Sequence, residues 1–206
     1  MNHKTTIALL GGALAALISG TAVAAPSIVG YWLKETEDPH KSAIIEIYPD
    51  GKTFDGRVLQ LKYPRFVEGE VSSTGEVVPP ELVGEVKTDV LNPTEILRKR
   101  PIEGLKLIEG FKPAGDGEWK DATIYNPEDG KTYQCKAELS DDGNTLEVRG
   151  FVGFALLGRT QTWTRLASPE AVGWARPDGG DADAQSADAD VDAASNNLAA
   201  TEPQED

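Results

Sequence analysis

The chain has 206 residues, of which 34 are acidic and 20 basic, and its formal net charge is −14. Phosphate contacts need clustered Lys and Arg side chains, so we expect no nucleic-acid partner. Two histidines and a single cysteine exclude a histidine cluster, a CxxC pair and an intrachain disulfide.

The first 24 residues have the layout of a secretory signal peptide. Lys4 precedes an apolar run at residues 7–18, and the small residues Ala22-Val23-Ala24 follow it. This run is shorter than the ~20 apolar residues that span a bilayer. We therefore expect cleavage after Ala24 or Ala25, no membrane span, and an exported, periplasmic mature protein.

Eight short segments between residues 27 and 166 have the alternation of apolar and polar side chains that is typical of strands. They are residues 28–34, 43–49, 53–61, 105–111, 118–125, 131–139, 145–151 and 159–166. Turn sequences such as Asp50-Gly51 separate them. So many short strands at close intervals predict an all-β sandwich or a closed up-and-down barrel.

Residues 64–100 interrupt this pattern with a long loop that is rich in proline and glycine. Loops of this length are uncommon unless they are functional or disordered. Asn92, Pro93 and Glu95 are residue types found at helix starts, and they predict one short helix at residues 93–99. The rest of the loop is either a lid over a barrel mouth or a plain insertion, and the sequence leaves both open.

Candidate catalytic and metal-binding side chains are scarce. Cys135 shares the apolar parity of its segment with Tyr133, which predicts an inward, buried thiol that behaves as a small hydrophobe. Once the signal peptide is removed, His40 is the only imidazole, and it lies in a polar loop. We therefore expect no catalytic residue, no metal site, no cofactor and no enzymatic activity.

The apolar stretch at residues 151–158 separates the last two predicted strands. If Phe154, Leu156 and Leu157 were exposed, they would mark a contact with a membrane or a partner. If they were buried, they would plug one end of a barrel. We expect burial.

Residues 178–206 contain nine acidic residues and no Lys or Arg, with almost no large apolar side chain. Such a composition cannot bury enough apolar surface to offset chain entropy. We expect a barrel domain at residues 25–168 and a disordered acidic tail at residues 169–206. Residues 25–177 keep 25 acidic and 19 basic residues, so the acidity belongs mainly to the tail.

Several blocks of the sequence carry a family resemblance. They are Asp129-Gly130-Lys131-Thr132-Tyr133-x-Cys135, Val148-Arg149-Gly150-Phe151-x-Gly153, residues 156–165, Gly30-Tyr31-Trp32 and residues 92–105. Together they resemble an exported bacterial family numbered 2147 among the domains of unknown function. The resemblance covers residues 27–166 and implies a small lipocalin-like β-barrel. Many members carry a CxxC pair where this chain has Glu-Gly-Glu-Val-Ser-Ser-Thr at residues 68–74, so no role of those cysteines carries over.

Gly30-x-Trp32 is similar to the G-x-W element of lipocalins, in which a Trp closes the barrel base beneath a basic residue of the last strand. The last predicted strand supplies Arg159 and Arg165. A guanidinium over an indole is a cation–π contact. We expect Gly30, Trp32, Arg159 and Arg165 to have this structural role in barrel closure.

The predicted fold is therefore an all-β, eight-stranded antiparallel barrel of lipocalin/calycin-like type with one short helix in a long loop. Our main hypothesis for function is a non-enzymatic periplasmic binding protein for a small apolar or amphipathic, lipid-like ligand. Candidate ligand contacts are Trp119, Tyr125, Tyr133 and Trp163, whose alternative role is core packing. The other hypothesis is a cell-envelope interaction or stress-related protein that has a filled barrel, no small-molecule ligand and an envelope protein as partner.

Overall fold

The computed structural model of the chain describes residues 27–72, 75–153, 156 and 158–174. The predicted signal peptide and residues 175–206 of the predicted tail lie outside the described residues. Within the described residues no helix is both long enough and apolar enough to cross a membrane. After the predicted domain boundary at residue 168, a 3₁₀ helix follows at Pro169–Val172, and the Lys62 ammonium lies 5.9 Å from the Trp174 ring centroid.

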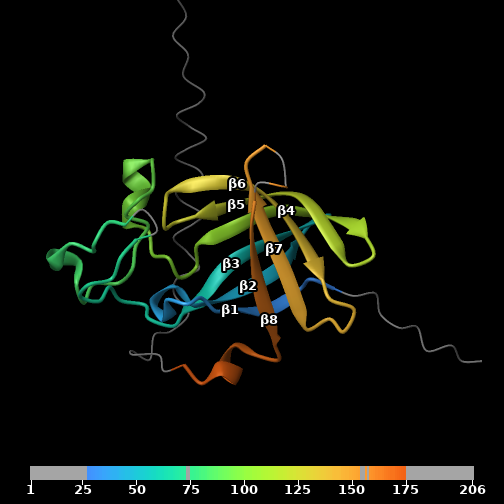
Figure 1. Cartoon of the computed structure of the whole chain (residues 1–206), viewed down its shortest axis with the longest axis horizontal. Coiled ribbons are helices and arrows are strands. Elements are labelled where there is room, and N and C mark those ends of the chain that lie inside the picture. The colour runs from blue at the N-terminus through green and yellow to red at the C-terminus, as the bar shows by residue number, and fades with distance from the viewer. Residues whose placement is uncertain (1–26, 73–74, 154–155, 157, 175–206) are drawn as a thin grey trace, which may run out of the picture.

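Eight antiparallel strands form one closed barrel, each strand paired with the next along the chain (Figure 1). They are β1 (Gly30–Lys34), β2 (Ala43–Asp50), β3 (Thr53–Leu61), β4 (Lys106–Gly115), β5 (Glu118–Asn126), β6 (Lys131–Leu139), β7 (Thr145–Phe151) and β8 (Arg159–Leu166). Antiparallel pairing of β8 with β1 closes the ring. The predicted eight-stranded barrel is confirmed, and of the two predicted architectures the sandwich is excluded.

Four strands differ from their predicted bounds, β2 and β5 by a single residue at the end and β1 and β4 by more. Strand β1 begins at Gly30, two residues later than predicted. Strand β4 runs to Gly115, because Lys112 and Pro113 continue the pairing with Lys120 and Trp119 of β5 up to the turn. The prediction ended this strand at residue 111. Here Pro113 stays within the hairpin.

One end of the barrel, which we call the closed end, is sealed by the side chains of Trp32 and Arg165. The indole of Trp32 is fully buried, and its N–H donates to the carbonyl of Ile28 at 2.9 Å. The Arg165 guanidinium carbon lies 4.2 Å from the Trp32 ring centroid, and its N–H groups donate to the carbonyls of Val29 and Ser27. The arginine therefore covers the indole and also ties the segment before β1 to β8.

Gly30 leaves room for this arrangement. Its φ is +135°, and a Cβ added at this position would lie 3.1 Å from Arg165 Nη1. Any larger residue would be strained in this conformation and would crowd the guanidinium.

Arg159 has a different place from the one predicted. It is the first residue of β8, pairs with Gly150 of β7 and is exposed. Six residues of strand, roughly 20 Å, separate it from Arg165, which is too far for contact with Trp32. The predicted role of Arg159 in barrel closure is therefore corrected, and Arg165 alone covers the indole.

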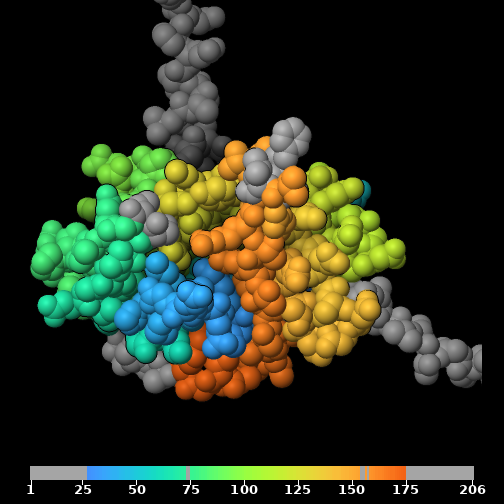
Figure 2. All heavy atoms as spheres, viewed as in Figure 1, coloured from blue at the N-terminus to red at the C-terminus, as the bar shows by residue number. Residues whose placement is uncertain are grey.

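The connections that join β1 to β2, β3 to β4, β5 to β6 and β7 to β8 gather at the opposite end, which we call the mouth end. The longest of them, residues 62–105, contains two 3₁₀ helices, Pro80–Leu82 and Glu95–Lys99. Figure 2 shows this segment, in teal and green, bulging beside the blue N-terminal residues. The predicted helix is shorter than expected, because Thr94 is its N-cap and the Asn92 side chain instead accepts a hydrogen bond from the Thr94 N–H at 2.8 Å.

The connection between β7 and β8 is exposed at residues 152, 153 and 156. Leu156 keeps 88% of its surface and Val152 keeps 69%. The expected burial of this stretch is therefore wrong at Leu156, while Phe154 and Leu157 lie outside the described residues. Leu156 therefore does not plug the barrel.

Candidate ligand-binding site

The mouth end of the barrel encloses a cavity of about 700 Å³. Pockets of roughly 300–1,000 Å³ hold small organic ligands. Most of the wall is formed by apolar residues and a glycine on the inward faces of five strands: Ala43, Ile45, Val58, Leu61, Leu107, Ile124, Val148 and Gly150. Trp163 also lines the cavity, whereas its partner on β7, Leu146, does not, so this pair marks the lower limit of the space.

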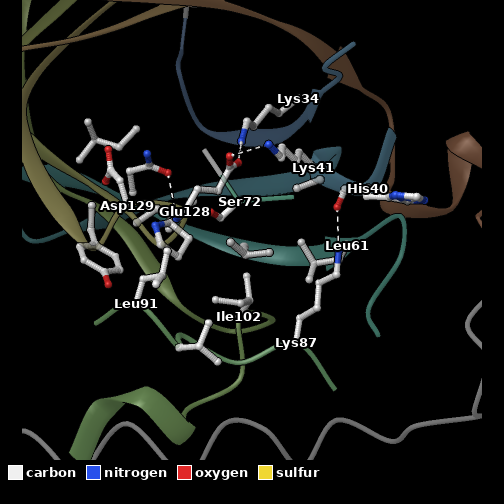
Figure 3. Close-up of a pocket in the computed structure, with 18 of the residues that line it drawn as sticks. Lys34, His40, Lys41, Leu61, Ser72, Lys87, Leu91, Ile102, Glu128 and Asp129 are labelled. Carbon is white, nitrogen blue, oxygen red and sulfur yellow. Dashed lines mark hydrogen bonds and ion pairs between the residues drawn. The ribbon is translucent and has the colours of Figure 1, made fainter. Parts of the chain in front are cut away.

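The long connection between β3 and β4 completes the cavity. Its apolar side chains Phe66, Val78, Leu82, Val90, Leu91 and Ile102 line the space from the side that the strands leave open. Figure 3 shows Leu91 and Ile102 of this connection across from Leu61. The loop is therefore part of the site and not a separate insertion.

Three of the four predicted ligand contacts line the cavity, namely Tyr125, Tyr133 and Trp163. The fourth, Trp119, is 5% exposed and lies near the closed end, where it pairs with Pro113 and Ala137. Its indole N–H has no hydrogen-bond partner within the described part of the chain. The prediction placed all four side chains inside the barrel without their depth, because alternation gives the face of a strand and not the height along it.

A buried carboxylate fixes the loop to the barrel wall. Asp89 is fully buried and accepts hydrogen bonds from the guanidinium of Arg100 at 2.9 and 3.1 Å, from Asn92 at 2.7 Å and from the Tyr125 hydroxyl at 2.7 Å. The Arg100 guanidinium also lies 5.5 Å from the Tyr125 ring centroid. Burial, then the hydrogen bond to Asp89, raises the pKa of Tyr125 well above its ordinary value. Tyr125 is thus a neutral donor that ties β5 to the loop.

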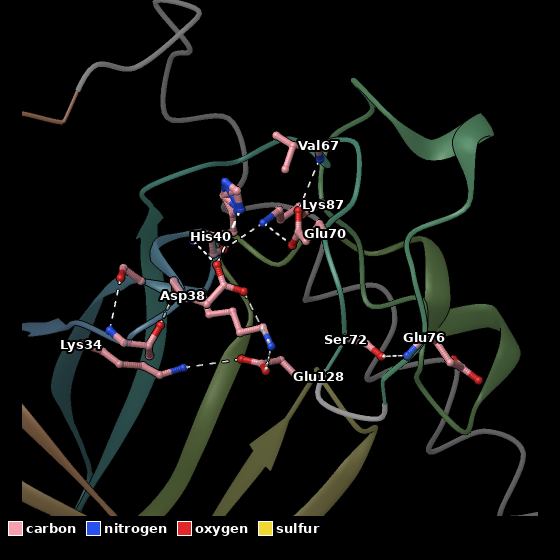
Figure 4. A network of polar contacts seen from close by, with 12 residues as sticks. Lys34, Asp38, His40, Val67, Glu70, Ser72, Glu76, Lys87 and Glu128 are labelled. Atoms are coloured by element: carbon pink, nitrogen blue, oxygen red, sulfur yellow. Dashed lines mark hydrogen bonds and ion pairs between the residues drawn. The ribbon is translucent and has the colours of Figure 1, made fainter.

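A second buried contact joins the loop to the connection between β1 and β2. The Lys87 ammonium donates to Glu70 at 2.7 Å and to the carbonyl of His40 at 2.9 Å (Figure 4). The side chains of both Lys87 and Glu70 are under 10% exposed. The other oxygen of Glu70 accepts from the Val67 N–H. Lys87 therefore makes two short hydrogen bonds inside the rim of the cavity.

A third charged group lies at the mouth, where Lys34 and Lys41 flank one carboxylate. Their ammonium groups lie 3.9 and 3.5 Å from the two oxygens of Glu128 (Figure 3). Burial lowers the pKa of Lys34, Glu128 opposes this shift, and Lys41 adds to it. The sequence contained a signal for Lys34 that we did not use, because it has the same inward parity on β1 as Trp32.

The structure also places His40 and Cys135, the two candidate side chains for catalysis in the sequence. The His40 ring stands edge-on to Tyr63 with ring centroids 4.7 Å apart, and its Nδ1 lies 3.6 Å from Asp38. Cys135 is buried as predicted, and burial raises the pKa of its thiol to about 12. Among the described residues, no group of three or more His, Cys, Asp or Glu could hold a metal ion.

Comparison with known proteins gives the same architecture. The structure is similar to a Helicobacter pylori protein, HP1028, described as belonging to the lipocalin family. The two share 22% identity and a TM-score of 0.56 over 75% of this chain and 94% of that one. The comparison with curated proteins gives no match. Residues 30–165 match the family described as uncharacterised proteins conserved in bacteria, DUF2147, and the chain belongs to that family.

Proposed function

We propose that this chain is a non-enzymatic binding protein that holds a small apolar or amphipathic ligand in the mouth end of its barrel. The observation that carries the proposal is the cavity of about 700 Å³ between apolar strand walls and the apolar side chains of the long loop. Burial of an alkyl group there removes about 0.8 kcal/mol of unfavourable hydration per CH₂. The lipocalin-like fold agrees with such a role, although fold alone does not assign it.

The chemistry of the cavity supports binding rather than catalysis. The polar groups of Asp89, Tyr125 and Lys87 already bind one another or the backbone, so they position the loop. The single cysteine has a protonated, inward thiol at neutral pH. We therefore assign the site to reversible uptake of a ligand.

Export to the periplasm is part of the proposal and rests on the signal-like first 24 residues. N-terminal sequencing of the chain from a periplasmic extract tests it. We expect a mature N-terminus at Ala25 or Pro26. A chain that keeps Met1 and stays in the cytoplasm would contradict export.

Native mass spectrometry tests the binding role directly. The mature chain is purified from its export compartment and weighed before and after extraction with organic solvent. We expect a reproducible mass difference that extraction removes, together with a small apolar or amphipathic molecule in the extract. A chain with the same mass in both states, which also takes up no alkyl ligand added afterwards, would contradict the proposal.

A second candidate function, contact with an envelope partner, is favoured by the exposed side chains Leu156 and Val152. The cavity disagrees with the filled barrel of that hypothesis, but a contact through surface side chains does not require the barrel to be filled. A photo-crosslinking amino acid at position 156 is expected to give one discrete adduct in intact cells. The same probe at Lys120, on the outer face of β5, is the control, and identical adduct patterns at both positions would contradict a specific contact.

A further inference from the structure

Lys34 is a charged residue at an inward position of β1, where the alternating pattern of a barrel strand predicts an apolar side chain. It ends β1, pairs with Ala43 of β2 and shares its inward parity with Trp32. Only 16% of its side-chain surface is exposed, and the side chain lines the cavity. Burial of an ammonium in apolar surroundings is unfavourable unless the group is well paired.

The pairing of Lys34 is poor. Its contact with Glu128 is 3.9 Å long, beyond the 2.7–3.2 Å range of N–H···O hydrogen bonds, and within the described chain its ammonium has no hydrogen bond. The contrast is Lys87 in the same cavity, whose ammonium has partners at 2.7 and 2.9 Å. Lys34 therefore has donors available for a further acceptor.

Lys41 adds a second cation beside it. Its ammonium lies 3.5 Å from the other oxygen of Glu128 and 3.9 Å from Asp38. Asp38 is already the cap of the short 3₁₀ helix Pro39–Lys41, where it accepts the His40 N–H at 3.0 Å. Figure 4 shows Glu128 reaching from the connection between β5 and β6 toward Lys34. Two ammonium groups from the β1 side thus share one carboxylate from the other side of the mouth.

We propose that Lys34 and Lys41 bind the terminal oxyanion, a carboxylate or a phosphate monoester, of a single-chain amphiphile whose alkyl chain fills the cavity. This inference rests on the proposed function. Glu128 then holds the place of the ligand oxyanion in the ligand-free chain. Charge-assisted hydrogen bonds to an oxyanion would satisfy the donors that Glu128 leaves unused.

The arrangement of polar and apolar surface sets the direction of the ligand. The strand walls below the lysines present apolar side chains, as at Ile45, Val58 and Val148, so an alkyl chain fits downward and a charged head does not. The lysine pair lies at the mouth, where the head stays near water. A neutral or cationic head would leave the Lys34 donors unpaired.

The test compares four ligands with the same alkyl chain, namely dodecanoate, dodecyl phosphate, 1-dodecanol and dodecylamine. Each is titrated into the delipidated chain below its aggregation concentration, and affinity is read by calorimetry. We expect at least one oxyanion to bind about tenfold more tightly than the alcohol, and the amine to bind more weakly than the alcohol. The stronger of the two oxyanions identifies the head group.

Three variants separate head-group binding from a structural role. Lys34→Met keeps the length and apolar stem of the side chain, and we expect it to remove the preference for the oxyanion while dodecanol affinity stays within about twofold. Lys112→Met, at an exposed lysine of β4, is the matched control and should change nothing. Glu128→Gln removes the competing carboxylate and should raise the affinity for the oxyanion. If the ion pair between Lys34 and Glu128 were purely structural, Lys34→Met and Glu128→Gln would both weaken binding to the same extent.

The outcomes are distinguishable. Equal affinity for dodecanol and both oxyanions, unchanged by Lys34→Met, would overturn the head-group inference and leave the proposed binding function intact. Tighter binding of dodecylamine than of the other ligands would mean that Glu128 recognises the head group, and this result would also overturn the head-group inference. Binding of none of the four ligands would overturn the proposed function itself. Thermal unfolding of each variant checks folding, and if Lys34→Met does not fold, Lys41→Met and Glu128→Gln decide the question.

Discussion

The closed end and the mouth end of the barrel are built on the same eight strands, yet one is filled and the other hollow. At the closed end the inward side chains are large, as at Trp32, Phe111 and Leu146, and all are fully buried. At the mouth end the inward positions enclose a cavity of about 700 Å³. On β2 and β7 the difference follows the size of the inward side chains.

On two strands the inward side chains become smaller from the closed end to the mouth end. The inward residues of β7 become smaller toward the mouth, from Leu146 through Val148 to Gly150. On β2 the two isoleucines nearer the closed end give way to Ala43 at the mouth. On these two strands, close packing at one end and open space at the other therefore follow from the size of the inward side chains. We expect the filled end to supply most of the stability, and the hollow end is where we propose that the ligand binds.

The largest expected effect is at the closed end. Trp32→Ala removes a fully buried indole and should lower the free energy of unfolding by about 3–5 kcal/mol. Leu107→Ala, at an inward position beside the cavity, should cost about 2 kcal/mol, since open space already adjoins the side chain. Urea unfolding of both variants measures the difference, and equal costs would contradict the division into a packed and a hollow half.

The next effect concerns the loop that closes the cavity. Asp89→Asn removes the charge that binds Arg100 and Tyr125, and we expect a loss of about 2–3 kcal/mol. Asp121→Asn is the control, because this carboxylate is 55% exposed and its ion pair with Lys112 is worth at most about 1 kcal/mol. If the two variants lose the same stability in urea, the buried network does not fix the loop.

The Tyr125 hydroxyl makes the mouth end sensitive to alkaline pH. Its pKa is raised in the folded chain, by burial and by the hydrogen bond to Asp89, whereas unfolded tyrosine titrates near about 10. Its contribution to stability is therefore present below about pH 10 and is lost as pH rises toward the folded pKa. Between about pH 9 and 11 the wild type should lose more unfolding free energy than Tyr125→Phe. Parallel pH curves would contradict this role.

The smallest expected effect is at the exposed tip of the mouth. Leu156→Ala should change the free energy of unfolding by no more than about 0.5 kcal/mol, because the side chain is 88% exposed. A loss of 2 kcal/mol or more in urea, roughly the cost of a buried leucine, would mean that Leu156 packs against the barrel.

Much of the fold could be predicted from local pattern. Strands β6, β7 and β8 begin and end where alternation and turn residues predicted, because period-two patterning and Gly-containing turns are local properties. The extension of β4 past Pro113 could not be predicted this way, since it depends on pairing with β5. The exposure of Leu156 likewise depends on where the strands end.

The candidate site was only partly predictable. Inward parity identified Tyr133 and Trp163, but it could not separate them from Trp119, whose depth depends on the stagger of the strands. Tyr125 also lines the cavity, although the register shift between Trp119 and Ala122 gives it the parity opposite to that of buried Ala122. The contacts of Asp89 with Tyr125 and of Lys87 with Glu70 and His40 join segments 17 to 47 positions apart along the chain, and no local pattern marks them. The same parity rule could have identified Lys34, because it shares its parity on β1 with Trp32.

The most direct test adds volume to each half of one strand. Val148→Phe fills the hollow half, and Leu146→Phe, two residues away on β7, overfills the packed half. We measure dodecanol affinity and urea stability for both. We expect Val148→Phe to weaken dodecanol binding about tenfold or more without a loss of stability in urea. Leu146→Phe should lower the free energy of unfolding by about 1–3 kcal/mol and leave dodecanol affinity within about twofold. Unchanged affinity in Val148→Phe would contradict the claim that the hollow half of the barrel is the binding site.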